Sequence, residues 1–192
     1  MALGERFDEA LVYASRLHAD QTRKGSGAPY ISHLLGVASI VIEHGGSEDE
    51  AIGALLHDAV EDQGGQPTLE AIRKRFGPAV AEIVDGCSDS DTTPKPPWRE
   101  RKEQYLAHLP GASRSVQLVS AADKLYNCRS IVDDYLRVGD DVWQRFKGGR
   151  DGTLWYYRAI VEAFSELDGT ALLEQLDRSV TELESLAGTR SA

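Results

Sequence analysis

The sequence predicts an all-α fold in a single domain over residues 1–192, on three observations. Apolar residues recur at intervals of three and four along nearly the whole chain, which is the spacing of one helix face. Alternating apolar and polar runs are never longer than a few residues, so no strand is predicted. The length of 192 residues is enough to bury a substantial core in one domain.

The first three helices are predicted by their apolar stripes and by the residues at their ends. The first two stripes run over residues 7–17 and 31–42. The pair Gly45-Gly46 ends the second helix. Ser47 followed by Glu50 is a capping box that opens the third helix. The core face of this third helix comprises Ile52, Leu55, Leu56 and Ala59.

The rest of the chain is also helical, with one long interruption. A short helix is expected to begin at Thr68, and Pro78 suits the first position of the next helix. Residues 86–98 are turn-rich and longer than a usual helix connection, so a functional rim and a surface excursion are both open. A polar helix follows from about Arg99. Three further helices are predicted over residues 115–135, 154–164 and 168–188.

The last of these helices, over 168–188, carries a leucine-rich stripe with two uses. It can pack back on its own domain, which is the commoner arrangement, or it can form a homodimer interface. The sequence leaves both open.

The charge balance excludes polyanionic partners. The chain has 21 basic and 31 acidic residues, a formal net charge of −10. This charge repels nucleic acid polymers and anionic membranes, so neither is expected as a partner. A small phosphorylated substrate remains compatible, because local cations or a bound metal reverse the field inside one pocket. No apolar run approaches the ~20 residues of a membrane span, and the first residues lack a signal-peptide pattern, so a cytoplasmic location is expected.

The clearest candidate site is the motif His57-Asp58-x-x-Glu61-Asp62. On a continuous helix it places an imidazole and three carboxylates on one side. Carboxylates crowded in this way repel one another unless a counter-charge is present. A divalent cation supplies that charge and takes both carboxylate and imidazole ligands. An acidic, solvated helix end is the alternative for this motif taken alone.

Two distant residues strengthen the metal interpretation. His33 begins an amphipathic helix off its apolar stripe, and Asp123 lies inside an apolar helical segment, where it needs a partner. A salt bridge to Lys124 is an alternative, although adjacent residues on a helix do not face each other. With His57 and Asp58 these residues make a set of two nitrogen and two oxygen ligands from three helices, which indicates a metal site.

The ordered motifs resemble a known family. His33, His57-Asp58 and Asp123 match the H…HD…D pattern of HD-domain metal-dependent phosphohydrolases. Over about residues 6–166 the chain is similar to the hydrolase domain of RelA/SpoT-type alarmone enzymes, above all the small stand-alone hydrolases that include the metazoan SpoT homologue. The motifs that carry this resemblance are His18-x-x-Gln21-x-Arg23-Lys24, Gly27-x-Pro29-Tyr30-Ile31-x-His33, Ala54-Leu55-Leu56-His57-Asp58-x-Val60-Glu61-Asp62, Phe76-Gly77-x-x-Val80 and Ala122-Asp123-Lys124-Leu125-Tyr126-Asn127-x-Arg129.

The resemblance implies a helical HD-domain bundle with a bound metal, typically Mn²⁺. It implies hydrolysis of the 3′-pyrophosphate of (p)ppGpp to GDP or GTP and pyrophosphate. The metal ligands that it implies are His33, His57, Asp58 and Asp123.

The same resemblance assigns the remaining site residues. Glu61 and Asp62 match the acidic pair that positions and activates water, and a carboxylate is a suitable general base. Arg23 matches the arginine that packs on the guanine, as its planar guanidinium allows. The other implied substrate contacts are Lys24, Asn127 and Ser130.

Several positions depart from the family pattern and leave the substrate open. Gln63 stands where the family commonly has threonine, Leu34 where a proline often follows the histidine, and Ser120-Ala121 where Lys-Leu usually precedes Ala-Asp. None of these departures falls on the four implied metal ligands. Alarmones such as (p)ppApp, or NADPH, are therefore alternative substrates, a general nucleotide phosphatase is a further enzyme alternative, and a non-catalytic nucleotide sensor is the alternative to an enzyme.

Overall fold

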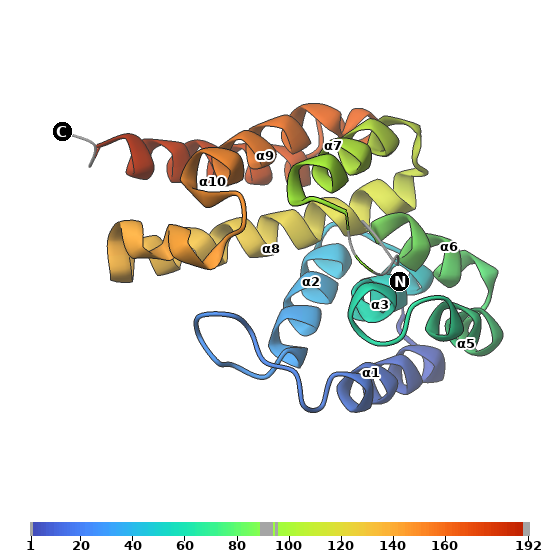
Figure 1. Ribbon diagram of the computed structural model, residues 1–192. Helices are drawn as coiled ribbons and strands as arrows, with labels where there is room; N and C mark the ends of the chain where they lie inside the picture. The colour runs from blue at the N-terminus through green and yellow to red at the C-terminus, as the bar shows by residue number, and fades with distance from the viewer. Residues whose placement is uncertain (1, 89–93, 95, 190–192) are drawn as a thin grey trace.

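A computed structural model describes residues 2–88, 94 and 96–189, and within them the secondary structure is helical apart from an isolated bridge between Thr22 and Pro29 (Figure 1). The all-α prediction is confirmed. The α-helices are α1 Glu5–Leu17, α2 Ile31–Glu43, α3 Glu48–Leu56, α4 Ala59–Asp62, α5 Gln66–Phe76, α6 Pro78–Cys87, α7 Trp98–His108, α8 Arg114–Val138, α9 Gly149–Ala163 and α10 Ala171–Thr189. Short 3₁₀ segments lie at Leu109–Gly111, Gly139–Arg145 and Ser165–Leu167. None of the helices in the described part of the chain is both long and apolar enough to cross a membrane.

The long helix α8 lies at the centre of the molecule. It packs against α2, α3 and α6 on one side and against α10 on the other, as Figure 1 shows. Ser113 caps its first turn by accepting a hydrogen bond from the backbone of Val116. Its central position brings side chains of α8 next to those of α2 and of the α3–α4 junction.

Close approach of α2 to α8 depends on Gly36. A Cβ atom at this position would lie 2.0 Å from the ring of Tyr126 on α8, so only glycine leaves room for that ring. The approach places His33, one turn earlier on α2, beside Asp123, one turn earlier on α8. A single small residue thus sets the spacing between two of the predicted metal ligands.

The predicted helix ends are confirmed in part, because α9 begins at Gly149, five residues before the predicted 154, and α10 begins at Ala171, three residues after the predicted 168. The capping box is present, with Ser47 Oγ accepting from the Glu50 backbone and Glu50 accepting from the Ser47 backbone. Helix α5 begins at Gln66, two residues before the predicted Thr68, with Pro67 in its first turn, where proline is favourable. The Thr68 hydroxyl donates to the Gln63 carbonyl, just before the helix.

The predicted loop at 86–98 is shorter than expected, because α6 continues to Cys87 and α7 begins at Trp98. The half-buried Cys87, whose thiol faces the Val116 carbonyl, and Gly86, which packs on Val116, extend the helical face that contacts α8. Residues 89–93 and 95, which include the loop's Asp89, Asp91 and Lys95, lie outside the described residues.

The C-terminal stripe packs within the chain. Leu172, Leu176, Val180 and Leu183 are buried where α10 meets α8 and α9. Of the stripe predicted over 154–164, Tyr157 and Phe164 are buried, whereas Leu154 and Val161 are half-buried. The other buried residues of α9 are Thr153, Tyr156 and Ile160.

Candidate metal centre

Four side chains from three parts of the chain converge at one point. The Nε2 atom of His33 lies 3.3 Å from Asp58 Oδ2 and 3.3 Å from Asp123 Oδ1. The Nε2 atom of His57 lies 3.1 Å from Asp58 Oδ2 and 3.5 Å from Asp123 Oδ1. The predicted set of two nitrogens and two oxygens is therefore assembled.

The neutral ring of His57 presents a free lone pair to this point. His57 Nδ1 donates to the Ala54 carbonyl at 2.8 Å, which leaves its Nε2 unprotonated in the neutral ring. The side chains of His33 and His57 are 1% and 3% exposed, and within the described residues neither Nε2 atom has a hydrogen-bond partner. Buried nitrogens without partners cost free energy unless something binds them. Neutral imidazole with carboxylate oxygen is a donor set that suits a divalent metal, so these residues fit one.

The helix carrying the His-Asp pair is broken, contrary to the prediction of a continuous helix. Helix α3 ends at Leu56, and α4 begins at Ala59. Asp58 between them has φ −93° and ψ −2°, outside regular helical geometry. The break turns the adjacent side chains of His57 and Asp58 toward the same point, which two successive residues of a regular helix do not reach.

Polar groups outside the four residues hold the two carboxylates. The Tyr30 hydroxyl donates to Asp58 Oδ2 at 2.6 Å, and Asn127 Nδ2 donates to Asp123 Oδ1 at 2.5 Å. Lys124 bonds Oδ2, the other oxygen of Asp123. The expectation that Lys124 does not face Asp123 is therefore wrong, because the long lysine side chain curls back to the outer oxygen. Oδ1 of Asp123 therefore faces the two imidazoles, while its Oδ2 bonds Lys124.

The charges in this cluster reinforce one another. Burial by itself raises the pKa of Asp58, but His57 and His33 outweigh it and hold that pKa well below its usual range. Burial likewise opposes ionisation of Asp123, and Lys124 and both imidazoles lower its pKa. Burial lowers the pKa of His57, and the two aspartates raise it further than burial lowers it. The carboxylates are thus ionised at neutral pH, ready to bind a cation.

A basic side chain lines the cluster from the α1–α2 connection. Arg23 donates to Asn127 Oδ1 at 2.7 Å, and its guanidinium lies 5.8 Å from the ring centres of both Tyr30 and Tyr126. Asn127 therefore joins Arg23 to Asp123, a predicted metal ligand.

Two further predicted substrate contacts lie near this network, and within the described residues neither bonds to Arg23 or Asn127. Lys24 is exposed on the same turn as Arg23. Ser130 is half-buried on α8, one turn after Asn127, and its hydroxyl donates to the Tyr126 carbonyl.

The two acidic residues of α4 have separate partners. Asp62 accepts from Gln21 Nε2 at 2.8 Å. Glu61 Oε1 lies 3.8 Å from the guanidinium of Arg101, a buried cation of α7. The pair predicted to activate water is thus oriented from two different elements.

Sequence reasoning gave no role to Tyr30, Gln21 or Arg101. Tyr30 stands three residues before His33, the spacing that brings side chains to one helix face, and this signal could have identified it. Two neighbouring basic side chains of α7 lie over aromatic rings, Arg99 at 3.2 Å over that of Trp155 and Lys102 at 4.8 Å over that of Tyr156. The buried arginine between them approaches Glu61 instead.

Comparison with known proteins identifies the family of this chain. A family model described as HD domain matches residues 10–154. The chain belongs to the HD-domain family. Its HD motif is the His57-Asp58 pair at the α3–α4 break, completed by His33 and Asp123.

Relatives within the HD-domain family carry a specific activity in their names. The guanosine-3′,5′-bis(diphosphate) 3′-pyrophosphohydrolase MESH1 of Xenopus tropicalis is 44% identical over 126 residues, 64% of this chain and 68% of that protein. Human MESH1 is 40% identical over 126 residues, with 64% and 68% covered. A solved structure of a metazoan orthologue of SpoT that hydrolyses ppGpp has a TM-score of 0.76 and 26% identity, covering 100% of this chain and 98% of that one.

Proposed function

We propose that this protein is a metal-dependent pyrophosphohydrolase that removes the 3′-pyrophosphate of (p)ppGpp-type alarmones. The products are GDP or GTP and pyrophosphate. The observation that carries the proposal is the convergence of His33, His57, Asp58 and Asp123 beside the acidic pair of α4. The MESH1 relatives, named for this reaction, support the choice of substrate.

The metal that we propose for this site is Mn²⁺, held by the four converging residues. When bound, it would lower the pKa of a coordinated water molecule and polarise the phosphoryl group. The Tyr30 hydroxyl and Asn127 amide keep the two carboxylates oriented toward it. Lys124 neutralises the outer oxygen of Asp123.

The side chains around the centre take the other roles. Glu61 and Asp62 position the attacking water and accept its proton, as carboxylates do at neutral pH. Arg23 stacks on the purine, and Tyr30 and Tyr126 support its guanidinium. Lys24 follows Arg23 on the same turn and Ser130 lies one helical turn from Asn127, so we assign both to phosphate or nucleotide contacts.

A substrate panel tests the proposal. Metal-stripped protein is supplied with Mn²⁺ and then with ppGpp, ppApp, NADPH or a 5′-nucleotide, and pyrophosphate and phosphate are measured. The proposal predicts equimolar GDP and pyrophosphate from ppGpp, dependent on added metal. Turnover of 5′-nucleotides alone, or none at all, contradicts it.

Glu61→Gln separates an enzyme from a nucleotide sensor. The substitution keeps the side-chain shape and removes the base. For an enzyme, binding of ppGpp persists and hydrolysis is lost by about 10²–10⁴-fold. Wild-type protein that binds ppGpp without turnover identifies a sensor. The matched control is Glu103→Gln, the same change at an exposed residue of α7 bonded to Arg99, and it should leave hydrolysis unchanged.

A further inference from the structure

A relay of hydrogen bonds runs from the end of α1 to Asp62, with the Gln21 amide at its middle. Gln21 Nε2 donates to Asp62 Oδ2 at 2.8 Å. Gln21 Oε1 accepts from Gln63 Nε2 at 2.7 Å and lies 2.7 Å from His18 Nδ1. The relay connects the α1–α2 segment with the end of α4, where the acidic pair lies.

The carboxylate of Asp62, at one end of the relay, determines which group donates and which accepts in every bond of it. A carboxylate only accepts, so Gln21 must present its NH₂ group to Asp62 and its carbonyl oxygen to the other two partners. That oxygen only accepts, so His18 must carry its proton on Nδ1. The amide of Gln21 is thus held in one of its two flip states.

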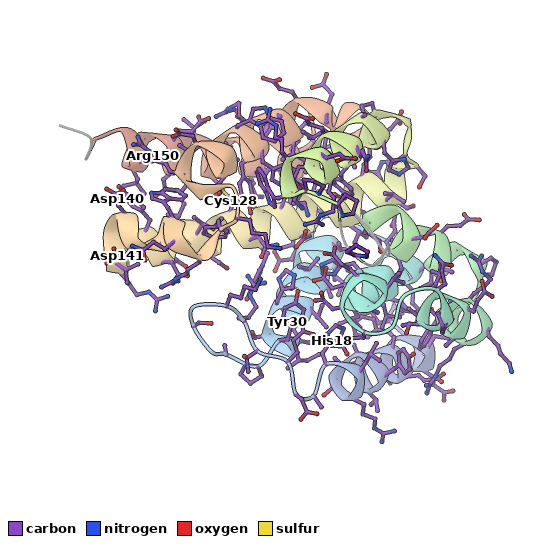
Figure 2. The ribbon with its side chains drawn as sticks, viewed as in Figure 1. His18, Tyr30, Cys128, Asp140, Asp141 and Arg150 are labelled. Carbon is purple, nitrogen blue, oxygen red and sulfur yellow. The ribbon has the colours of Figure 1, made fainter. Side chains whose placement is uncertain are left out.

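Burial of His18 holds the far end of the relay. Its side chain is 2% exposed, and its ring stacks on that of Tyr30 at a centroid distance of 5.3 Å and an angle of 17°. Figure 2 labels His18 and Tyr30 near each other. Among the described residues, His18 Nε2 is buried without a hydrogen-bond partner. A proton there would be a buried donor without an acceptor, which favours the Nδ1-protonated tautomer. The same Tyr30 donates to Asp58, so one aromatic stack supports the relay and a predicted metal ligand.

We propose that Gln21 is a positioning residue of the hydrolase reaction, holding Asp62 in its working orientation, with His18 and Gln63 fixing Gln21. This inference rests on the proposed function. A threonine hydroxyl at position 63 would lie two bonds nearer the backbone than the Gln63 amide nitrogen, so Gln63→Thr would remove the second donor to Gln21.

Gln21→Glu tests the role, because it keeps the shape and replaces the donor to Asp62 with an acceptor. The expected result is a fall in kcat of about 10–100-fold, the range for loss of a group that orients a site residue. The KM for ppGpp and the amount of Mn²⁺ bound per chain should stay unchanged. Gln104→Glu, the same change at an exposed position of α7, is the control and should leave kcat unaltered. Gln63→Thr should give a smaller loss than Gln21→Glu.

A second background separates positioning from a general structural effect. In Asp62→Asn protein the group that Gln21 holds is already disabled, so adding Gln21→Glu should lower kcat no further. An unchanged kcat in the single variant, an equal loss in both backgrounds, or loss of bound metal would each overturn the inference.

The tautomer of His18 provides a readout independent of catalysis. Nitrogen NMR of ¹⁵N-histidine-labelled protein, assigned with His18→Asn, should show His18 protonated on Nδ1. Protonation on Nε2 would refute the relay. Wild-type protein inactive on every 3′-phosphorylated nucleotide would refute the proposed function together with the positioning role, whereas active wild type with an unaffected Gln21→Glu variant would refute the positioning role alone.

Discussion

Removing one hydroxyl group should weaken the metal centre without touching a ligand. Tyr30→Phe keeps the ring that stacks on His18 and deletes the hydroxyl that donates to Asp58 at 2.6 Å. Burial, reinforced by Asp58, raises the pKa of Tyr30 far above its ordinary value, so this hydroxyl is a donor wherever the protein is folded. The perturbation is therefore the loss of one charge-assisted hydrogen bond.

The expected effect has two parts, one on stability and one on metal affinity. A hydrogen bond to a charged group contributes about 1.5–3 kcal/mol, and the free energy of unfolding of the metal-free protein should fall by that amount. Loss of a group that orients a metal ligand typically weakens metal binding or activity by about 10–100-fold. The Mn²⁺ dissociation constant of Tyr30→Phe should rise within that range, because Asp58 must then be ordered on binding.

Two titrations measure the outcome. Urea unfolding in the presence of a chelator reports the stability, and Mn²⁺ competition with a fluorescent chelator reports the affinity. Tyr13→Phe is the control, since Tyr13 is a half-buried tyrosine of α1 whose ring packs on Phe76. A Tyr30→Phe protein with unaltered metal affinity and stability would refute the role of this hydroxyl.

The remaining predictions concern substrate binding, packing and protons. Asn127→Ala removes the partner of Arg23 and should raise KM for ppGpp by about 10-fold, since a bond to a charged group is lost; an unchanged KM contradicts this. Gly36→Ala places a methyl group 2.0 Å from a ring on α8 and should cost about 1–3 kcal/mol in thermal unfolding, whereas Gly111→Ala, with open space around it, should not. The pKa of His57 is raised in the metal-free protein, so at a pH below that raised value its ring is protonated and Mn²⁺ must displace the proton. Calorimetry in buffers of different ionisation enthalpy should show this release, and it should vanish as pH rises through the folded-state pKa; heats independent of the buffer would contradict it.

Local signals in the sequence predicted the helices well. The Ser47–Glu50 capping box and Pro78 at a helix start depend on neighbouring residues, and both are confirmed. The break at His57-Asp58 was missed because apolar periodicity continues across it: Leu56 and Ala59 are both fully buried. Periodicity reports which residues face the core and carries no information on a local change of backbone direction.

The sequence predicted which side chains lie together at the candidate centre but not how they are supported. His33, His57, Asp58 and Asp123 meet as expected, because their residue types fit a metal and the motif pattern orders them. Their supports depend on distances between helices, which spacing along the chain does not encode. Tyr30 reaches Asp58 across 28 positions, and Gln21 reaches Asp62 across 41.

The metal content and activity of Asp123→Asn test the central claim most directly. The substitution keeps the side-chain size and removes the charge that faces both imidazoles. Wild-type protein should bind Mn²⁺ and release pyrophosphate from ppGpp, and the folded variant should lose both. A folded Asp123→Asn protein that retains its metal and its pyrophosphate release would contradict the assignment of this centre.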